Sequence, residues 1–152
     1  MIDLLKKVNL FETLTESELA KIEKICRKED FAKSAVIFKE EDLGDRCYVI
    51  TKGEVRISKL IPNIGEEALA VLKPGDYFGE MALIDNFPRS AHAIANTDAE
   101  VYAINKTDLD KLLIMDREVG YKLLWAFTKT LSRRLRETNE KLANFLAMSS
   151  GF

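Results

Sequence analysis

The sequence is poor in the residues that carry disulfide and metal chemistry. It has only two cysteines and one histidine among 152 residues. Cys26 and Cys47 are too few and too isolated for a disulfide framework or a metal site. We therefore expect two buried, reduced thiols in a cytoplasmic protein that holds no metal and no cofactor.

Strong charge of one sign and long apolar runs are also missing. The formal net charge is −2, which gives no global electrostatic case for binding nucleic acid. No apolar run approaches the roughly 20 residues of a membrane span. The segment Met1–Lys7 lacks the apolar core and the cleavage site of a signal peptide. These absences predict a protein without membrane association.

What is present is the composition of an ordinary folded domain. Hydrophobic residues make up 47% of the chain and charged residues 32%, as in soluble globular proteins. The length allows one domain with a sizeable core. Because no low-complexity linker or internal repeat interrupts the chain, we expect a single domain over residues 1–152.

The two ends of the chain have helical patterns, and residues 30–105 do not. Thr15 and Glu18 form a capping box that opens a helix running to about Arg27, so helices are expected within residues 1–29. Between residues 30 and 105, short strand candidates alternate with Gly or Pro turns, which is typical of a closed or double-sheet β unit. The sequence therefore predicts an α+β fold.

The last third, residues 107–148, is expected to be helical. Thr107 resembles a cap for a first helix, and Asp116 caps a second helix that continues to about residue 147. The apolar and small positions of the second helix repeat at intervals of four and three, as in a coiled-coil seam. These positions are Leu124, Thr128, Leu131, Leu135, Thr138, Leu142 and Phe145. The spacing favours a dimer seam, although the same face could pack on its own β domain.

Residues 78–91 are the stretch with the most chemistry. Glu80 can accept hydrogen bonds from hydroxyl groups, and Arg89 offers a forked donor that matches a phosphate. Small residues on either side allow backbone N–H groups to approach a ligand closely. The stretch predicts a cradle for an anion that also carries hydroxyl groups.

The order of these residues resembles the phosphate-binding cassette of the cyclic-nucleotide-binding domain family. The match is Gly-Glu-x-Ala-Leu from Gly79, followed by Pro-Arg-Ser-Ala with Arg89 nine residues after Glu80. The glycine turns before the cassette and the long final helix are similar to those of the catabolite-activator effector domain. The resemblance covers nearly the whole chain and implies a double-stranded β-helix, a jelly-roll-like β-roll, flanked by the terminal helices.

The resemblance also implies roles for individual residues. Glu80 would accept a hydrogen bond from the ribose 2′-hydroxyl, and Arg89 would pair with the cyclic phosphate. Thr138 and Asn139 match positions that contact the base, and Ser90 favours cAMP over cGMP. The remaining ligand-binding residues, which would line the phosphate and sugar, are Gly79, Met81, Ala82, Ser90 and Ala91.

Simpler structural roles compete with these. Glu80 and Arg89 could form an ion pair with each other. Thr138 could be only a polar seam residue that sets register. His92 suggests a haem ligand because some relatives bind haem, but a structural role is favoured. The basic run within residues 129–136 is expected to be a solvated helix face.

The sequence and the resemblance together predict a regulatory sensor rather than an enzyme, since no activated nucleophile, metal cluster or general-base pair is recognisable. It would bind a cyclic purine mononucleotide, form a homodimer through the final helix and signal to an unknown downstream protein by movement of that helix. We expect no DNA-binding helix-turn-helix, so DNA binding is not implied. The alternatives are a scaffold or dimerisation module that no longer needs nucleotide, and a fragment of a larger regulator.

Overall fold

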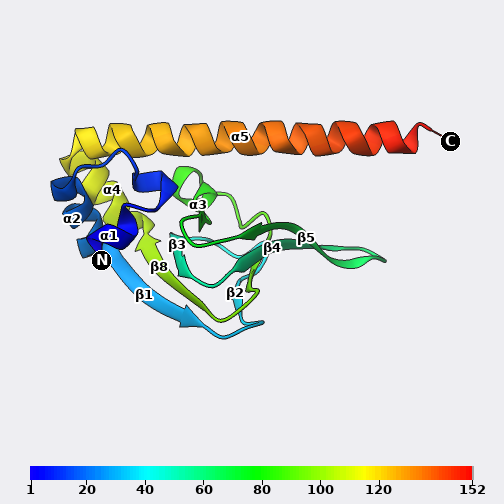
Figure 1. Cartoon of the computed structure of the whole chain (residues 1–152), viewed down its shortest axis with the longest axis horizontal. Helices are drawn as coiled ribbons and strands as arrows, with labels where there is room; N and C mark the ends of the chain where they lie inside the picture. The colour runs from blue at the N-terminus through cyan, green and yellow to red at the C-terminus, as the bar shows by residue number, and fades with distance from the viewer. Residues whose placement is uncertain (152) are drawn as a thin grey trace.

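A computed structural model describes residues 1–151 and shows a β-roll with helices at both ends of the chain (Figure 1). The N-terminal helices are α1 (Ile2–Leu5), the 3-10 helix η1 (Asn9–Phe11) and α2 (Glu16–Ile25). The predicted capping box of α2 is confirmed, because the Thr15 hydroxyl accepts from the Glu18 N–H and the Glu18 carboxylate accepts from the Thr15 N–H.

The β-roll consists of two four-stranded antiparallel sheets. This architecture confirms the expected α+β fold. The first sheet has the order β1 (Cys26–Phe31), β8 (Ala99–Asn105), β3 (Arg46–Lys52) and β6 (Tyr77–Phe78). The second has the order β2 (Val36–Phe38), β7 (His92–Ala95), β4 (Val55–Ile61) and β5 (Gly65–Leu72).

The first sheet is covered on both faces, which explains the continuous apolar run in β3. Tyr48 and Ile50 belong to the cluster of buried side chains inside the roll. Cys47 and Val49 belong to a second cluster that the terminal helices share. Successive residues of a strand point to opposite faces, so a strand between two apolar layers has no polar face.

The start of the roll differs from the sequence prediction. Helices were expected through residue 29, but α2 ends at Ile25 and β1 spans Cys26–Phe31. Residues 27–30 are all charged, which is common in edge strands and conceals them from periodicity arguments. Pairing with β8 in an unbroken antiparallel register forms the strand. Of the strand expected over 31–38, only Phe31 and β2 are extended in sheets.

Two helices follow the roll: α4 (Lys106–Met115) and α5 (Arg117–Ser149). Asp116 caps α5 as predicted, since its carboxylate accepts from the Val119 N–H. The cap of α4 is Asn105 rather than Thr107, because the Asn105 side chain already accepts from the Thr107 N–H at 3.0 Å. The last residue of β8 therefore also begins α4.

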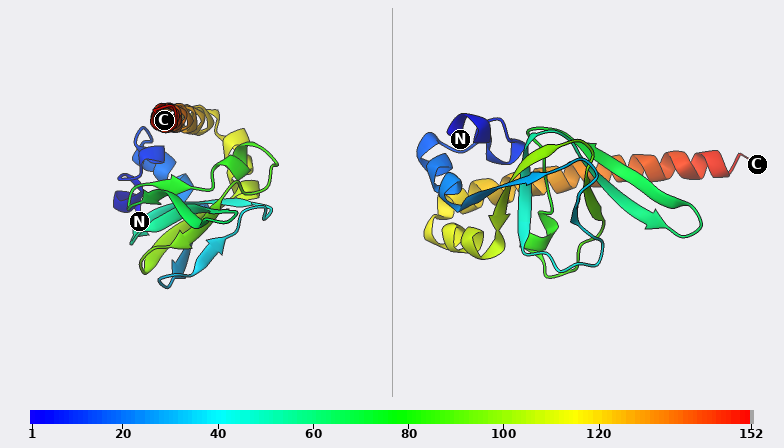
Figure 2. Two further views of the ribbon diagram at one scale, coloured as in Figure 1. Left: turned by 90° about the vertical axis from the view of Figure 1, so that its right-hand side faces the viewer. Right: turned by 90° about the horizontal axis from the view of Figure 1, so that it is seen from below.

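The buried residues of the long helix α5 all lie near its beginning. Val119, Leu123 and Phe127 are buried against the terminal-helix cluster. Glu18 of α2 holds Lys122 at 2.9 Å, and Lys21 pairs with Asp116. Farther along, α5 passes over the cassette and continues past the roll, in the direction in which the β4–β5 hairpin also points (Figure 1, Figure 2). Within residues 1–151 no helix combines the length and apolar character needed to cross a bilayer.

Candidate functional site

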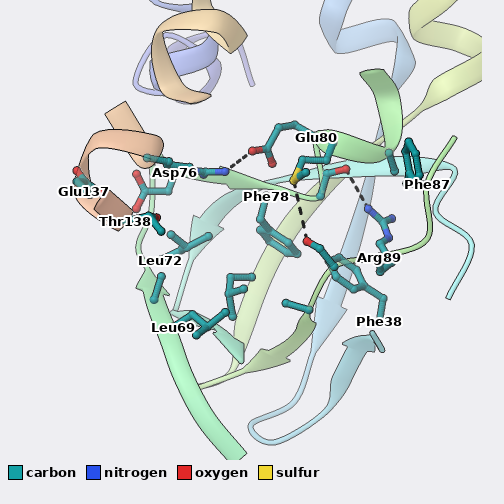
Figure 3. Close-up of a pocket in the computed structure, with 18 of the residues that line it drawn as sticks. Phe38, Leu69, Leu72, Asp76, Phe78, Glu80, Phe87, Arg89, Glu137 and Thr138 are labelled. Atoms are coloured by element: carbon teal, nitrogen blue, oxygen red, sulfur yellow. Dashed lines mark hydrogen bonds and ion pairs between the residues drawn. The ribbon is translucent and has the colours of Figure 1, made fainter. Parts of the chain in front are cut away.

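A cavity of about 610 Å³ lies between the cassette, the β4–β5 sheet edge and one face of α5. This volume is within the usual range for small-molecule sites. Arg89 stands at one end of the cavity, Thr138 of α5 at the other, and Glu80 between them (Figure 3). Glu80 and Arg89, ionisable groups of opposite sign, therefore line a single pocket the size of a small-molecule site.

The Arg89 side chain is held in place by backbone carbonyls. It is 7% exposed, and its two terminal nitrogens donate to the carbonyl oxygens of Gly79 at 2.9 Å and Arg46 at 2.7 Å. The guanidinium lies 4.1 Å from the centre of the Phe38 ring. Burial lowers the pKa of Arg89, but a guanidinium remains charged in a protein at neutral pH.

This buried cation has no anionic partner in the described chain. None of the ion pairs within residues 1–151 includes Arg89, and its Nε is buried without a hydrogen-bond acceptor. A buried charge is costly unless it is paired, so the arrangement is suited to an incoming anion.

Two glycines make the space that the guanidinium occupies. A Cβ at Gly44 would lie 2.6 Å from the Arg89 Cζ, and a Cβ at Gly79 would lie 2.7 Å from its Nη1. Gly79 also has φ of 75°, a conformation that side chains other than glycine rarely adopt. After this turn the short helix α3 (Met81–Ile84) begins.

The turn at residues 40–42 supports Arg89 from the other side. Its sequence is Glu-Glu-Asp, and Glu41 takes a φ of 72°. The Glu41 N–H donates to the Arg89 carbonyl, and the Arg89 N–H donates to the Asp42 carbonyl, both at 2.8 Å. The turn is therefore hydrogen-bonded to the cassette although a non-glycine residue occupies the left-handed position.

Glu80 is bound by a residue that the sequence did not single out. Its carboxylate is 2% exposed and accepts a hydrogen bond from Arg134 of α5. Arg134 also donates to the Tyr77 carbonyl at 3.0 Å. The alternative of a Glu80–Arg89 ion pair is wrong, because the carboxylate pairs with Arg134 instead.

Arg134 was expected on a solvated face and instead lines the cavity. The signal that could have identified it is its position four residues before Thr138, which puts both residues on one face of α5. Because Arg134 belongs to α5 and Glu80 to the cassette, this ion pair links the helix directly to the site.

The other predicted site residues divide into two groups. Most line the cavity: Gly79, Met81, Ala82, Ser90, Ala91 and Thr138. Asn139 is exposed on α5 and is outside this lining. The predicted contacts of each residue with a ligand remain predictions.

The side chains of His92, Cys26 and Cys47 contact other parts of the fold and do not line the cavity. The His92 Nδ1 accepts from the Glu40 N–H at 3.1 Å, on β7 and away from the cavity lining. Cys26 and Cys47 are both buried, as predicted. Burial raises the pKa of Cys26 to about 12 and also raises that of Cys47, which makes both unreactive as thiolates at neutral pH.

Comparison with known proteins gives concordant matches. The family model described as "Cyclic nucleotide-binding domain" matches residues 28–116. A "CRP-like cAMP-activated global transcriptional regulator" of Mycobacterium tuberculosis is 30% identical over 146 residues, which is 96% of this chain and 63% of the relative. The chain thus spans less than two thirds of that regulator's length.

The fold is also similar to the solved structures of two cyclic nucleotide-binding or PKA regulatory domains. A cyclic nucleotide-binding domain from Methylobacillus flagellatus has a TM-score of 0.83 at 27% identity, over 93% of this chain and 80% of the other. The regulatory domain of Toxoplasma gondii PKA, crystallised with cAMP, has a TM-score of 0.66 at 28% identity. That match covers 72% of this chain and 42% of the other.

Proposed function

The chain belongs to the cyclic nucleotide-binding domain family, and from that premise we propose that it is a regulatory sensor of a cyclic purine mononucleotide, with cAMP preferred. The observation that carries the proposal is the buried, unpaired guanidinium of Arg89 at one end of the cavity. The preference for cAMP is supported by Ser90 and by the relatives whose names mention cAMP.

In this proposal the cyclic phosphate binds at Arg89. The carbonyls of Gly79 and Arg46 fix the guanidinium plane in advance, so little side-chain freedom is lost on binding. The Arg89 Nε and the backbone N–H groups at the start of α3 donate to the phosphate oxygens. Charge-assisted hydrogen bonds of this kind are about twice as strong as neutral ones.

The ribose 2′-hydroxyl donates to Glu80. The Arg134 guanidinium donates a hydrogen bond to this carboxylate, and an ionised carboxylate can only accept hydrogen bonds. Arg134 is thus a positioning residue, which orients Glu80 toward the sugar while one of its nitrogens holds the Tyr77 carbonyl.

The signal leaves the site through α5. This helix carries both Arg134, which holds the ribose acceptor, and Thr138, which lies at the far end of the cavity. A ligand that engages the cassette and α5 together favours the conformation in which both are close. We propose that a downstream protein reads the position of α5, and that the domain itself catalyses no reaction.

A homodimer through α5 is the second part of the proposal. Leu135, Leu142 and Phe145 of the predicted seam are exposed by 55–66%. An apolar stripe with heptad spacing on a helix that extends past its own domain is suited to a second copy of the same helix. This stripe also supports the competing idea of an assembly module that does not need nucleotide.

Calorimetric titration and thermal shift with cAMP, cGMP and a cyclic dinucleotide test the function. A ligand at 100 times its Kd raises the unfolding free energy by about 2.7 kcal/mol, which is readily visible as a shift of Tm. Arg89→Leu should weaken cAMP binding by at least about 2 kcal/mol, because a charge-assisted contact is lost.

The matched control is Arg136→Leu, which removes an exposed cation of α5 outside the cavity lining. This variant should bind cAMP like the unmodified chain. If no cyclic nucleotide shifts Tm, or if Arg89→Leu binds cAMP with unchanged affinity, the sensor assignment fails and the assembly module is favoured.

A further inference from the structure

Lys141 is the cavity-lining cation of α5 that is still without a partner. Arg134 pairs with Glu80, and Arg133 donates to Glu137 at 3.4 Å. For the Lys141 ammonium, no hydrogen bond or ion pair exists with any residue in 1–151, although the residue lines the same cavity. The function proposed above assigns it no role.

Its position follows from the rise of the helix. Arg134 marks the place of the ribose acceptor on α5. Thr138 is four residues farther and Lys141 seven residues farther, which corresponds to about 6 Å and about 10 Å along the axis. Figure 3 shows the line from Arg89 past Glu80 to Thr138. Lys141 follows Thr138 by three residues on the same face of α5 and lines the same cavity. With phosphate at Arg89 and ribose at Glu80, the end of the cavity lined by Thr138 and Lys141 is left for the base.

An ammonium group that meets the O6–N7 edge of the base discriminates between purines. It can only donate hydrogen bonds. Guanine presents two acceptors there, O6 and N7, whereas adenine presents the acceptor N7 beside the N6 amino donor. The ammonium therefore gains more from a purine with a carbonyl at C6, and faces a like polarity at the N6 of adenine.

We propose that Lys141 is a specificity-determining residue that favours purines with a carbonyl at C6 and so narrows the preference for cAMP over cGMP. The inference rests on the proposed function, since it requires a cyclic purine nucleotide bound with its phosphate at Arg89. Glu137 contributes less to the choice, because its carboxylate is already engaged by Arg133 on the same helix.

A purely electrostatic role would look different. Lys141 also adds positive charge near an anionic ligand, and this attraction acts equally on every cyclic mononucleotide. The ratio of affinities between bases, rather than the affinity for any one ligand, therefore separates base recognition from general attraction.

The experiment measures Kd by calorimetry for cAMP, cGMP and cyclic IMP. Cyclic IMP has the C6 carbonyl of cGMP but not its N2 amino group, so it isolates the contact at C6. The variants are Lys141→Met, which keeps the chain length and removes the charge, and Lys141→Arg, which keeps a donor. The control is Lys129→Met, an exposed lysine of α5 outside the cavity lining.

Lys141→Met should weaken cGMP and cyclic IMP by about tenfold relative to cAMP, which corresponds to one charge-assisted hydrogen bond. Lys141→Arg should restore most of that ratio, and Lys129→Met should leave it unchanged. Equal weakening of all three ligands, or an unchanged ratio, would overturn the assignment of Lys141 alone. If the unmodified chain binds none of the three, the proposed function fails together with it.

Discussion

Gly44→Ala is expected to weaken cyclic nucleotide binding although Gly44 does not line the cavity. Gly44 lies in the loop before β3, and its space is taken up by the Arg89 side chain. The added Cβ would lie 2.6 Å from the Arg89 Cζ and Nε, and 2.7 Å from the Ala82 Cβ. The methyl group thus meets the Arg89 guanidinium and the start of α3 at once.

The size of the effect follows from these distances. Ordinary contact begins at 3.4 Å, so the guanidinium must retreat by 3.4 − 2.6, or 0.8 Å. It is fixed by hydrogen bonds of 2.9 and 2.7 Å, and such a displacement stretches both well beyond the usual range. Overpacking costs roughly 1–3 kcal/mol in stability. Loss of one well-oriented charged hydrogen bond to the phosphate lowers affinity by about 1.5–3 kcal/mol, or roughly 10- to 150-fold.

The assay is calorimetric titration with cAMP, together with urea unfolding of the free protein. The control is Gly151→Ala, where the nearest heavy atom would be 3.8 Å from the new Cβ, and it should match the unmodified chain in both measurements. A Gly44→Ala variant that folds normally and binds cAMP with unchanged affinity would refute the view that the Arg89 geometry controls binding.

Three further predictions follow from the ion pairs and from α5. Arg134→Met should lower the free energy of unfolding by about 2 kcal/mol, because it leaves the buried Glu80 carboxylate without its counter-ion. In urea unfolding, adding Glu80→Gln to this variant should recover at least about 1 kcal/mol. Strictly additive losses of stability from the two substitutions would contradict the pairing. Two lysine ammonium groups lower the pKa of Glu100 from 4.5 to about 2. The contribution of Glu100 to stability is therefore full above pH 4.5 and is lost as the pH falls toward 2. The Tm difference between Glu100→Gln and the unmodified chain should shrink over this pH interval, and a constant difference would contradict the coupling between Glu100 ionisation and folding. Lysine at both Leu135 and Leu142 should convert the dimer to monomer in sedimentation experiments, whereas an unmodified chain that is already monomeric at high concentration would disprove the seam.

The cassette could be predicted because its chemistry is local in sequence. Glu80 and Arg89 lie nine residues apart in one stretch, and the hydrogen-bonding chemistry of their side chains predicts a common cradle. The partner of Glu80 could not be found this way, since Arg134 is 54 residues farther along the chain and reaches the site only through the packing of α5. Local sequence patterns identify the residues that could contact a ligand. They do not identify a distant side chain that orients one of those residues.

The strand β1 was missed for a related reason. Its residues 27–30 have neither an apolar alternation nor a turn signal, and the strand exists because β8 offers a free edge. The caps at Thr15 and Asp116 were predicted correctly, because a cap depends on residues only three positions apart. Strand β1 therefore forms because it pairs with β8, and not because its residues have a high intrinsic strand propensity.

In the proposed signalling, the part of α5 beyond Arg134 acts as a lever arm. Its fulcrum is at Arg134, and the 15 residues from there to Ser149 make an arm of about 22 Å. A tilt of roughly 10° at the fulcrum displaces the tip by about 4 Å. The gain depends on stiffness, and α5 contains no proline and a single glycine, Gly120, within its anchored first turn. A change in the stiffness or length of this arm would therefore alter the displacement of the helix tip without changing the residues that line the cavity.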